Sequence, residues 1–194
     1  MKRLMAAVGV ALLFGLGGAL SSLLFDGNNY LVRSSVTLPV PTFFLVPLPF
    51  AFLFTLLFLR TNREILAAPL FVVAWVAAFL SAVTSLKVVK EYLVLWCVGG
   101  LVGGLGVTLA ATLYRRHLLT VRYLAGGAAI GCAASLPFAI LSYWRDSHGG
   151  DPCATAGLQY PFGIWQAAVA VYLYLCTRTE KNARPEKPQE GHPL

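Results

Sequence analysis

The residues best suited to chemistry lie in a short polar segment between two apolar stretches. Five of its eight positions carry groups that could react or ligate: Asp146, Ser147, His148, Asp151 and Cys153. Histidine, carboxylate and thiol groups this close together can bind a metal or act as general acid and base. However, the spacing matches no established motif, and Gly149–Gly150 and Asp151–Pro152 favour turns. Two interpretations stay open, an outer-face catalytic site and a hydrated hairpin, and we assign neither a metal ligand nor a catalytic residue.

The other candidate for chemistry is an amide within an apolar stretch. Gln166 follows Trp165 in a run without charges. An amide surrounded by hydrocarbon needs a hydrogen-bond partner, for which we expect Ser135 or Thr108 on another helix. The alternative is that Gln166 contacts a ligand.

The cysteines predict little chemistry. No two of them form a Cys-x-x-Cys pair, which argues against a zinc knuckle or a thioredoxin-type motif. We interpret Cys97, Cys132 and Cys176 as small apolar fillers. A disulfide between Cys153 and Cys97 remains an alternative if this end of the chain faces an oxidising compartment.

The composition places these residues in a membrane protein. Of the 194 residues, 58% are hydrophobic and only 12% are charged, against about 25% charged in a typical soluble domain. The net charge of +7 does not predict nucleic-acid binding, because the basic residues fall in short clusters between apolar runs. That distribution is typical of membrane orientation signals.

Six apolar runs contain no Asp, Glu, Lys, Arg or His. We therefore predict an all-α integral membrane protein, a bundle of six transmembrane helices within a single domain, 1–176, followed by a disordered cytoplasmic tail, 177–194. The predicted spans are 4–25, 42–59, 65–86, 92–113, 123–144 and 160–176. The first run also resembles a signal peptide, but we favour a retained helix because the run is long.

Several local features refine these spans. The segment 26–41 is expected to be a loop, either irregular or extended with period two. The phenylalanine-rich second run is expected to face lipid, with Pro47 and Pro49 kinking or delaying its start. Pro137 is expected to bend the fifth span.

The basic residues predict the orientation. With six spans, eleven of the fifteen fall on the side of the termini: Lys2, Arg3, Arg60, Arg63, Arg115, Arg116, Arg122, Arg178, Lys181, Arg184 and Lys187. The other side has Arg33, Lys87, Lys90 and Arg145. This bias predicts that both termini are cytoplasmic, in a multi-pass protein of the cell membrane, most simply a bacterial inner membrane.

Small residues predict where helices pack closely. The segment 97–106 has five glycines in ten residues, which a membrane helix tolerates and uses for close approach. The fifth span offers a partner with the same spacing, and the first span has a small-residue ladder. The predicted packing residues are Ala7, Ala11, Gly15, Gly99, Gly100, Gly103, Gly104, Gly127 and Gly131.

The lack of ionisable residues within the spans argues against a proton- or sodium-coupled pump. We therefore predict a non-catalytic membrane subunit that binds or passes a small neutral or amphipathic solute, without a cofactor. Its groove would open outward, under the loops 26–41 and 145–159. The candidate ligand contacts are Gln166, Trp165, Trp96, Arg33, Arg145, His148 and Asp151. A membrane enzyme with an outer-face site and a structural or assembly protein remain the alternatives; the expected partners are the lipid bilayer and other membrane subunits.

In length and number of predicted spans, the chain resembles the substrate-binding subunits of energy-coupling-factor importers. Those subunits carry an Ala-x-x-x-Ala face on their first helix, and Ala7 and Ala11 have that spacing. The resemblance implies that this face docks a partner protein.

Overall fold

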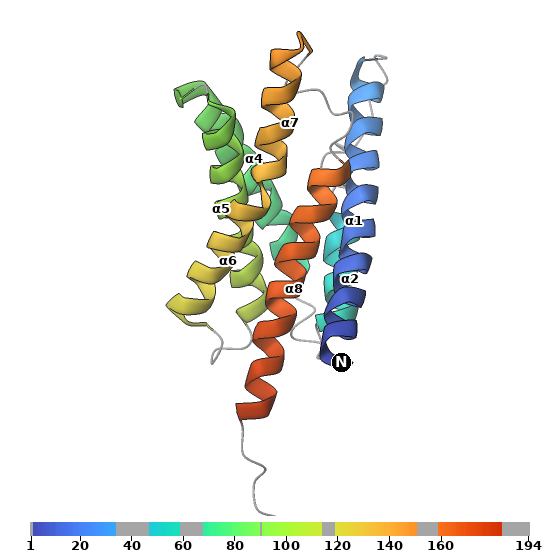
Figure 1. Cartoon of the computed structure of the whole chain (residues 1–194), viewed down its shortest axis with the longest axis vertical. Helices are drawn as coiled ribbons and strands as arrows, with labels where there is room; N and C mark the ends of the chain where they lie inside the picture. The colour runs from blue at the N-terminus through green and yellow to red at the C-terminus, as the bar shows by residue number, and fades with distance from the viewer. Residues whose placement is uncertain are drawn as a thin grey trace, which may run out of the picture.

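The computed structural model describes residues 2–33, 47–58, 68–89, 91–113, 119–150 and 159–183. Within these ranges every regular element is an α-helix and there is no strand, so the predicted all-α class is confirmed (Figure 1). The helices are α1 (Lys2–Arg33), α2 (Leu48–Phe58), α4 (Ala68–Val89), α5 (Tyr92–Thr112), α6 (Val121–Ala134), α7 (Leu136–Ser147) and α8 (Gln159–Ala183).

Three stretches of the described chain are long and apolar enough to cross a membrane: Leu4–Ser21 in α1, Tyr92–Thr112 in α5, and Val121–Ser147 across α6 and α7. The apolar part of α4, Pro69–Ala82, is shorter. The protein is therefore helical, with three segments suited to a membrane.

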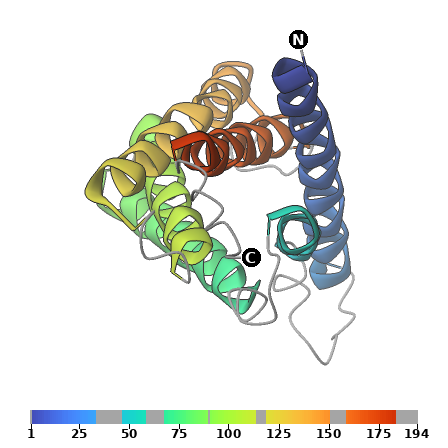
Figure 2. The same ribbon diagram turned by 90° about the horizontal axis from the view of Figure 1, so that it is seen from below.

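The helices pack in two groups. α5 lies between α4 and α6, while α1 lies along α8 (Figure 1, Figure 2). The first turn of α1 and the last turn of α8 lie at the same end of the molecule (Figure 1). The end of α7 lies at the other end, and α8 begins in that half of the molecule (Figure 1).

Aromatic side chains join the two groups. Phe14 of α1 packs edge-on against Phe50 of α2, with ring centroids 5.2 Å apart, and Phe54 lies 4.6 Å from Phe71 of α4. Phe50 and Phe54 are 4% and 1% exposed, whereas Phe52 on the other side of α2 is 64% exposed. The expectation that this phenylalanine-rich segment faces lipid is therefore wrong for Phe50 and Phe54, because their spacing of four places both on the inward face.

The fifth apolar run is divided into α6 and α7 at Ser135. Pro137 lies in the first turn of α7, where its missing N–H leaves no hydrogen bond unmade. A proline at this position would clash with the carbonyl four residues earlier if the helix were continuous. The Ser135 amide instead donates to the Cys132 carbonyl at 3.1 Å, in a tightened last turn. The predicted bend thus occurs as a break two residues before the proline.

Two helices extend beyond their predicted ends. α1 continues to Arg33, so the first part of the expected loop 26–41 is helical. Gly27 in this part lowers helix stability by only about 1 kcal/mol relative to alanine, which the neighbouring turns offset. α8 continues to Ala183, through seven residues assigned to the tail, because Arg, Glu, Lys and Ala in this part are good helix formers. The rest of both segments, 34–41 and 184–194, lies outside the described residues, as do 42–46 and 59 of the second span.

Candidate ligand cavity

A cavity of about 90 Å³ lies between α2, α4, α5, α7 and α8. Figure 2 shows these helices around one central region. The cavity lies in the half of the bundle where α2 and α8 begin, and its walls carry no ionisable residue. Eight of its seventeen lining residues are aromatic: Phe50, Phe71, Trp75, Phe79, Trp96, Phe138, Phe162 and Trp165.

The glycines of α5 form one wall of this cavity. A β-carbon on Gly103 would lie 2.9 Å from Trp165 Cζ2, and one on Gly99 would lie 2.9 Å from Ala82 Cβ. Both distances are too short for real contacts, so a larger residue would have to displace a neighbouring side chain. Glycine here lets α4 and the Trp165 ring lie against the backbone of α5.

The opposite face of α5 is closed against α6. A β-carbon on Gly104 would overlap the carbonyl oxygen of Gly127, and one on Gly131 would overlap that of Gly100. Of the glycines expected to pack closely, Gly100 and Gly104 therefore face Gly127 and Gly131 across α5 and α6. Because the groups in contact are backbone atoms, neither helix can accommodate an added carbon by a side-chain movement.

The polar side chains of the cavity wall mostly bond within the protein. Trp96 Nε1 donates to Ser142 Oγ at 2.9 Å, and Trp165 Nε1 donates to the Gly131 carbonyl at 3.1 Å. Ser135 Oγ, beside Gly100, donates to the Cys132 carbonyl at 2.6 Å. These bonds fix the orientation of both indole rings in the cavity wall.

Gln166 makes a different hydrogen bond from the one predicted. Its amide nitrogen donates to Ser21 Oγ of α1 at 3.1 Å, and Ser21 Oγ donates to the Gly17 carbonyl at 3.0 Å. The expected partners, Ser135 and Thr108, bond to carbonyls of their own helices instead. The prediction was wrong because the helix opposite Gln166 is α1.

The amide oxygen of Gln166 has no hydrogen-bond partner in the described part of the chain. The side chain is 2% exposed and the oxygen lies 3.6 Å from where a β-carbon on Gly17 would be. An unsatisfied buried acceptor costs about 1–3 kcal/mol. Gln166 is therefore a polar side chain between the cavity wall and α1 whose hydrogen-bonding capacity is only partly used.

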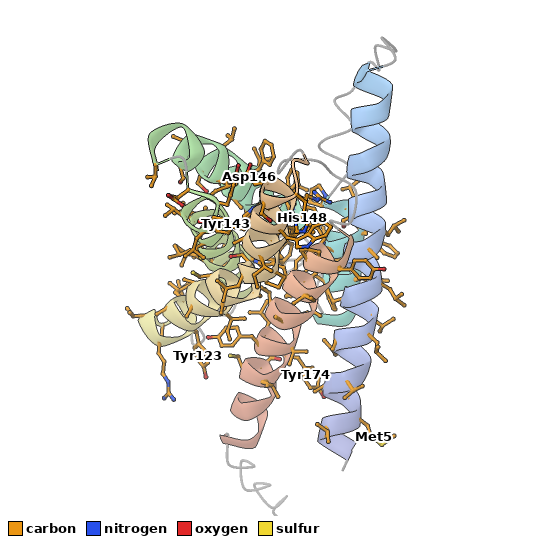
Figure 3. All side chains as sticks on the ribbon, turned by 45° about the horizontal axis from the view of Figure 1, so that its top comes forward. Met5, Tyr123, Tyr143, Asp146, His148 and Tyr174 are labelled. Carbon is orange, nitrogen blue, oxygen red and sulfur yellow. The ribbon has the colours of Figure 1, made fainter. Side chains whose placement is uncertain are left out.

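Two of the remaining predicted ligand contacts, Arg145 and His148, are not among the residues that line the cavity. His148 and Asp146 are exposed at the end of α7, with Tyr143 one turn earlier (Figure 3). His148 Nδ1 lies 2.7 Å from the Trp144 carbonyl oxygen, and its ring packs on the Trp144 ring. Arg145 is half-buried on the same turn.

The other two predicted contacts are Arg33 and Asp151. Arg33 is the last residue of α1, and Asp151 lies outside the described residues, as does Cys153. No group of three or more metal-ligating side chains occurs within the described ranges. Nothing in this part of the structure brings an acid–base pair together at the end of α7.

The small-residue ladder of α1 partly faces this chain's own α8. Gly15 lies against Gly163, and a β-carbon on Gly18 would lie 2.6 Å from the Gly163 Cα. Ala7 and Ala11, the positions suggested by the importer resemblance, are half-buried. Gly15 of the ladder thus packs within the chain, and docking of a partner at Ala7 and Ala11 stays a prediction.

The Cys97 thiol has neighbours at the end of α6. It interacts with Cys132 and Ser135, across the α5–α6 contact. Cys97, Cys132 and Cys176 are all free thiols.

Six aromatic residues of the cavity were not predicted from the sequence as ligand contacts: Phe50, Phe71, Trp75, Phe79, Phe138 and Phe162. Of the sequence candidates, the cavity brings together Trp96, Trp165 and Gln166. A usable signal was the position of aromatic residues relative to the small-residue faces, since a large ring fits where the facing helix carries glycine or alanine.

Comparison of the chain with protein-family models, curated proteins and solved structures finds no match. The cavity is therefore the basis for inferring the function of the chain.

Proposed function

We propose that this protein is a non-catalytic, multi-pass membrane protein that binds or passes a small neutral or amphipathic solute through the aromatic cavity. It would cross the cell membrane six times with both ends in the cytoplasm, most simply in a bacterial inner membrane. It would work within the lipid bilayer and beside other membrane subunits.

The helix arrangement and the charges support this topology. α1 begins and α8 ends at the same end of the molecule (Figure 1). Eleven of fifteen basic residues belong to the segments at that end in a six-span arrangement, as expected for a cytoplasmic face. The small residues on α1, α5 and α6 would act as packing faces that hold the spans together.

The observation that carries the functional proposal is the cavity. The cavity has a volume of about 90 Å³, lies between five helices and is partly open at the surface of the bundle. Its walls combine aromatic rings with two polar side chains, Ser135 and Gln166, and no charge. Largely apolar cavities with a few polar groups are typical of small-molecule sites.

The test is whether the purified protein carries a solute that depends on the cavity. Ala78 lines the cavity, whereas Ala77, the preceding residue of α4, is exposed. Ala78→Leu adds three carbon atoms to the wall and should remove a copurified small molecule, detected by mass spectrometry of an organic extract. Ala77→Leu, the matched control, should retain it.

If Ala78→Leu does not fold, Phe50→Trp is the second cavity variant, because it places a larger side chain in the wall formed by α2. A molecule that is retained in both cavity variants, or the absence of any bound molecule in the wild type, would refute the proposal. Topology is tested separately by reporter fusions after Leu194 and at Gly149–Gly150, which should report the cytoplasm and the outside, respectively.

A further inference from the structure

We propose that the solute is an uncharged aromatic molecule, or the uncharged aromatic part of an amphipathic one, held between the ring-bearing walls of the cavity. This inference rests on the proposed function, because it names the class of ligand for the same cavity. It follows from ring geometry, from the hydrogen bonds of the wall and from the available volume.

Two stacked ring pairs present flat surfaces in the cavity wall. Trp96 of α5 stacks on Phe138 of α7, with centroids 4.6 Å apart and planes 20° apart. On α4, Trp75 and Phe79 stack at 5.8 Å with planes 8° apart. Aromatic rings prefer offset-stacked or edge-on neighbours, so these surfaces favour a planar ring over a saturated one.

Edge-on contacts occur in the same wall. Phe162 meets Phe138 at 5.1 Å with planes 89° apart. Phe50 and Trp165 are tilted by 48° at 6.3 Å. A ring entering the cavity would find both the faces and the edges of neighbouring rings, the two contacts that aromatic groups make best.

The hydrogen bonds of the wall disfavour an anion. Two of the three indole N–H groups at the cavity, those of Trp96 and Trp165, donate to Ser142 and to the Gly131 carbonyl, and the Ser135 hydroxyl donates to the Cys132 carbonyl. No Lys, Arg or His lines the cavity. A buried carboxylate or phosphate would therefore lose its water without gaining a counter-charge.

The volume limits the size of the bound group. About 90 Å³ holds roughly six to nine water-sized groups at about 10–15 Å³ each. This suits one ring with a short substituent. A larger amphipathic solute would leave its polar part toward the end of the bundle where α2 and α8 begin.

The test compares three probes of similar size: toluene, methylcyclohexane and benzoate. Three of the four tryptophans line the cavity, so binding to the detergent-solubilised full chain is followed by intrinsic fluorescence. Toluene should bind saturably and roughly tenfold more tightly than methylcyclohexane, from two or more additional ring contacts. Benzoate should not compete with toluene.

Variants then show whether the ring walls cause the preference. Phe138→Leu removes one stacked surface but leaves an apolar wall, so it should lower the toluene preference about threefold while methylcyclohexane binding persists. Trp144→Leu, on the same helix but 58% exposed, should leave the preference unchanged. Phe79→Leu tests the other stacked pair independently if Phe138→Leu does not fold.

The outcomes separate the two proposals. If none of the probes binds saturably, the proposed function fails together with this inference. If toluene and methylcyclohexane bind equally, if benzoate competes, or if the preference survives both Phe138→Leu and Phe79→Leu, the cavity binds solutes but the aromatic assignment is wrong.

Discussion

Glycine has a different role on each of the two faces of α5. Toward α6, Gly104 meets the backbone of Gly127 so closely that no further atom fits. Toward α4 and α8, Gly103 lies against the side chain of Trp165 and borders a cavity. A glycine therefore does not by itself predict contact or space. At Gly104 the facing helix presents another glycine, whereas at Gly103 it presents the large ring of Trp165.

The largest effect is expected on the closed face. Gly104→Leu would drive a side chain into the Gly127 carbonyl, where only a separation of two helices could make room. Overpacking typically costs about 1–3 kcal/mol, and more where backbone must move, so we expect loss of the folded protein. The measurement is the yield of monodisperse protein on size-exclusion chromatography. A folded Gly104→Leu protein would contradict the α5–α6 packing.

The next largest effect is expected in the aromatic core beside the cavity. Phe54 is 1% exposed, so Phe54→Ala should lower stability by about 3 kcal/mol, the usual cost of a buried Phe→Ala change. The matched control is Phe52→Ala on the same helix, where the side chain is 64% exposed. Thermal unfolding in detergent should show a clear decrease for the first variant only. Equal decreases would mean that α2 is oriented differently.

A smaller effect is expected on the open face. Gly103→Ala places a β-carbon against Trp165 Cζ2, the edge of a side chain that can move. We expect a loss of stability of about 1 kcal/mol or less, with a blue or red shift in tryptophan emission as the ring moves. An effect as large as that of Gly104→Leu would remove the distinction between the two faces.

The smallest effect is expected where a glycine faces open space. A β-carbon on Gly9 of α1 would have no neighbour within 4 Å, so Gly9→Ala should be neutral or stabilise by up to about 1 kcal/mol through helix propensity. Thermal unfolding of Gly9→Ala, measured side by side with Gly104→Leu, gives the full range of expected stability effects. Clear destabilisation by Gly9→Ala would show that another surface covers this part of α1.

Much of the helical framework could be predicted from the sequence, because uncharged runs bounded by charges define membrane helices. The predicted span 92–113 nearly coincides with α5, which begins at Tyr92 and ends at Thr112. The ends of α1 and α8 were less predictable, since helix formers and turn formers differ by only about 1 kcal/mol there. The break at Ser135 could be anticipated from Pro137.

The cavity was only partly predictable. Gln166 next to Trp165 in an uncharged run predicted a polar side chain beside an aromatic ring. The glycine run predicted a helix that other helices approach closely. The sequence could not place Ser21 opposite Gln166, because periodicity defines the face of each helix but not which helix lies against it. For the same reason the inward positions of Phe50 and Phe54 followed only from the packing of α2.

Bromobenzene quenching of single tryptophans tests the central claim, solute binding on the open face of α5, most directly. Two full-length variants are compared, one keeping only Trp165 at the cavity and one keeping only Trp144, which is 58% exposed. The other tryptophans are replaced by phenylalanine. We predict saturable quenching of Trp165 and a linear, unsaturated response of Trp144, which only senses bromobenzene dissolved in the surrounding detergent or lipid. Linear quenching of both tryptophans would contradict binding in the cavity.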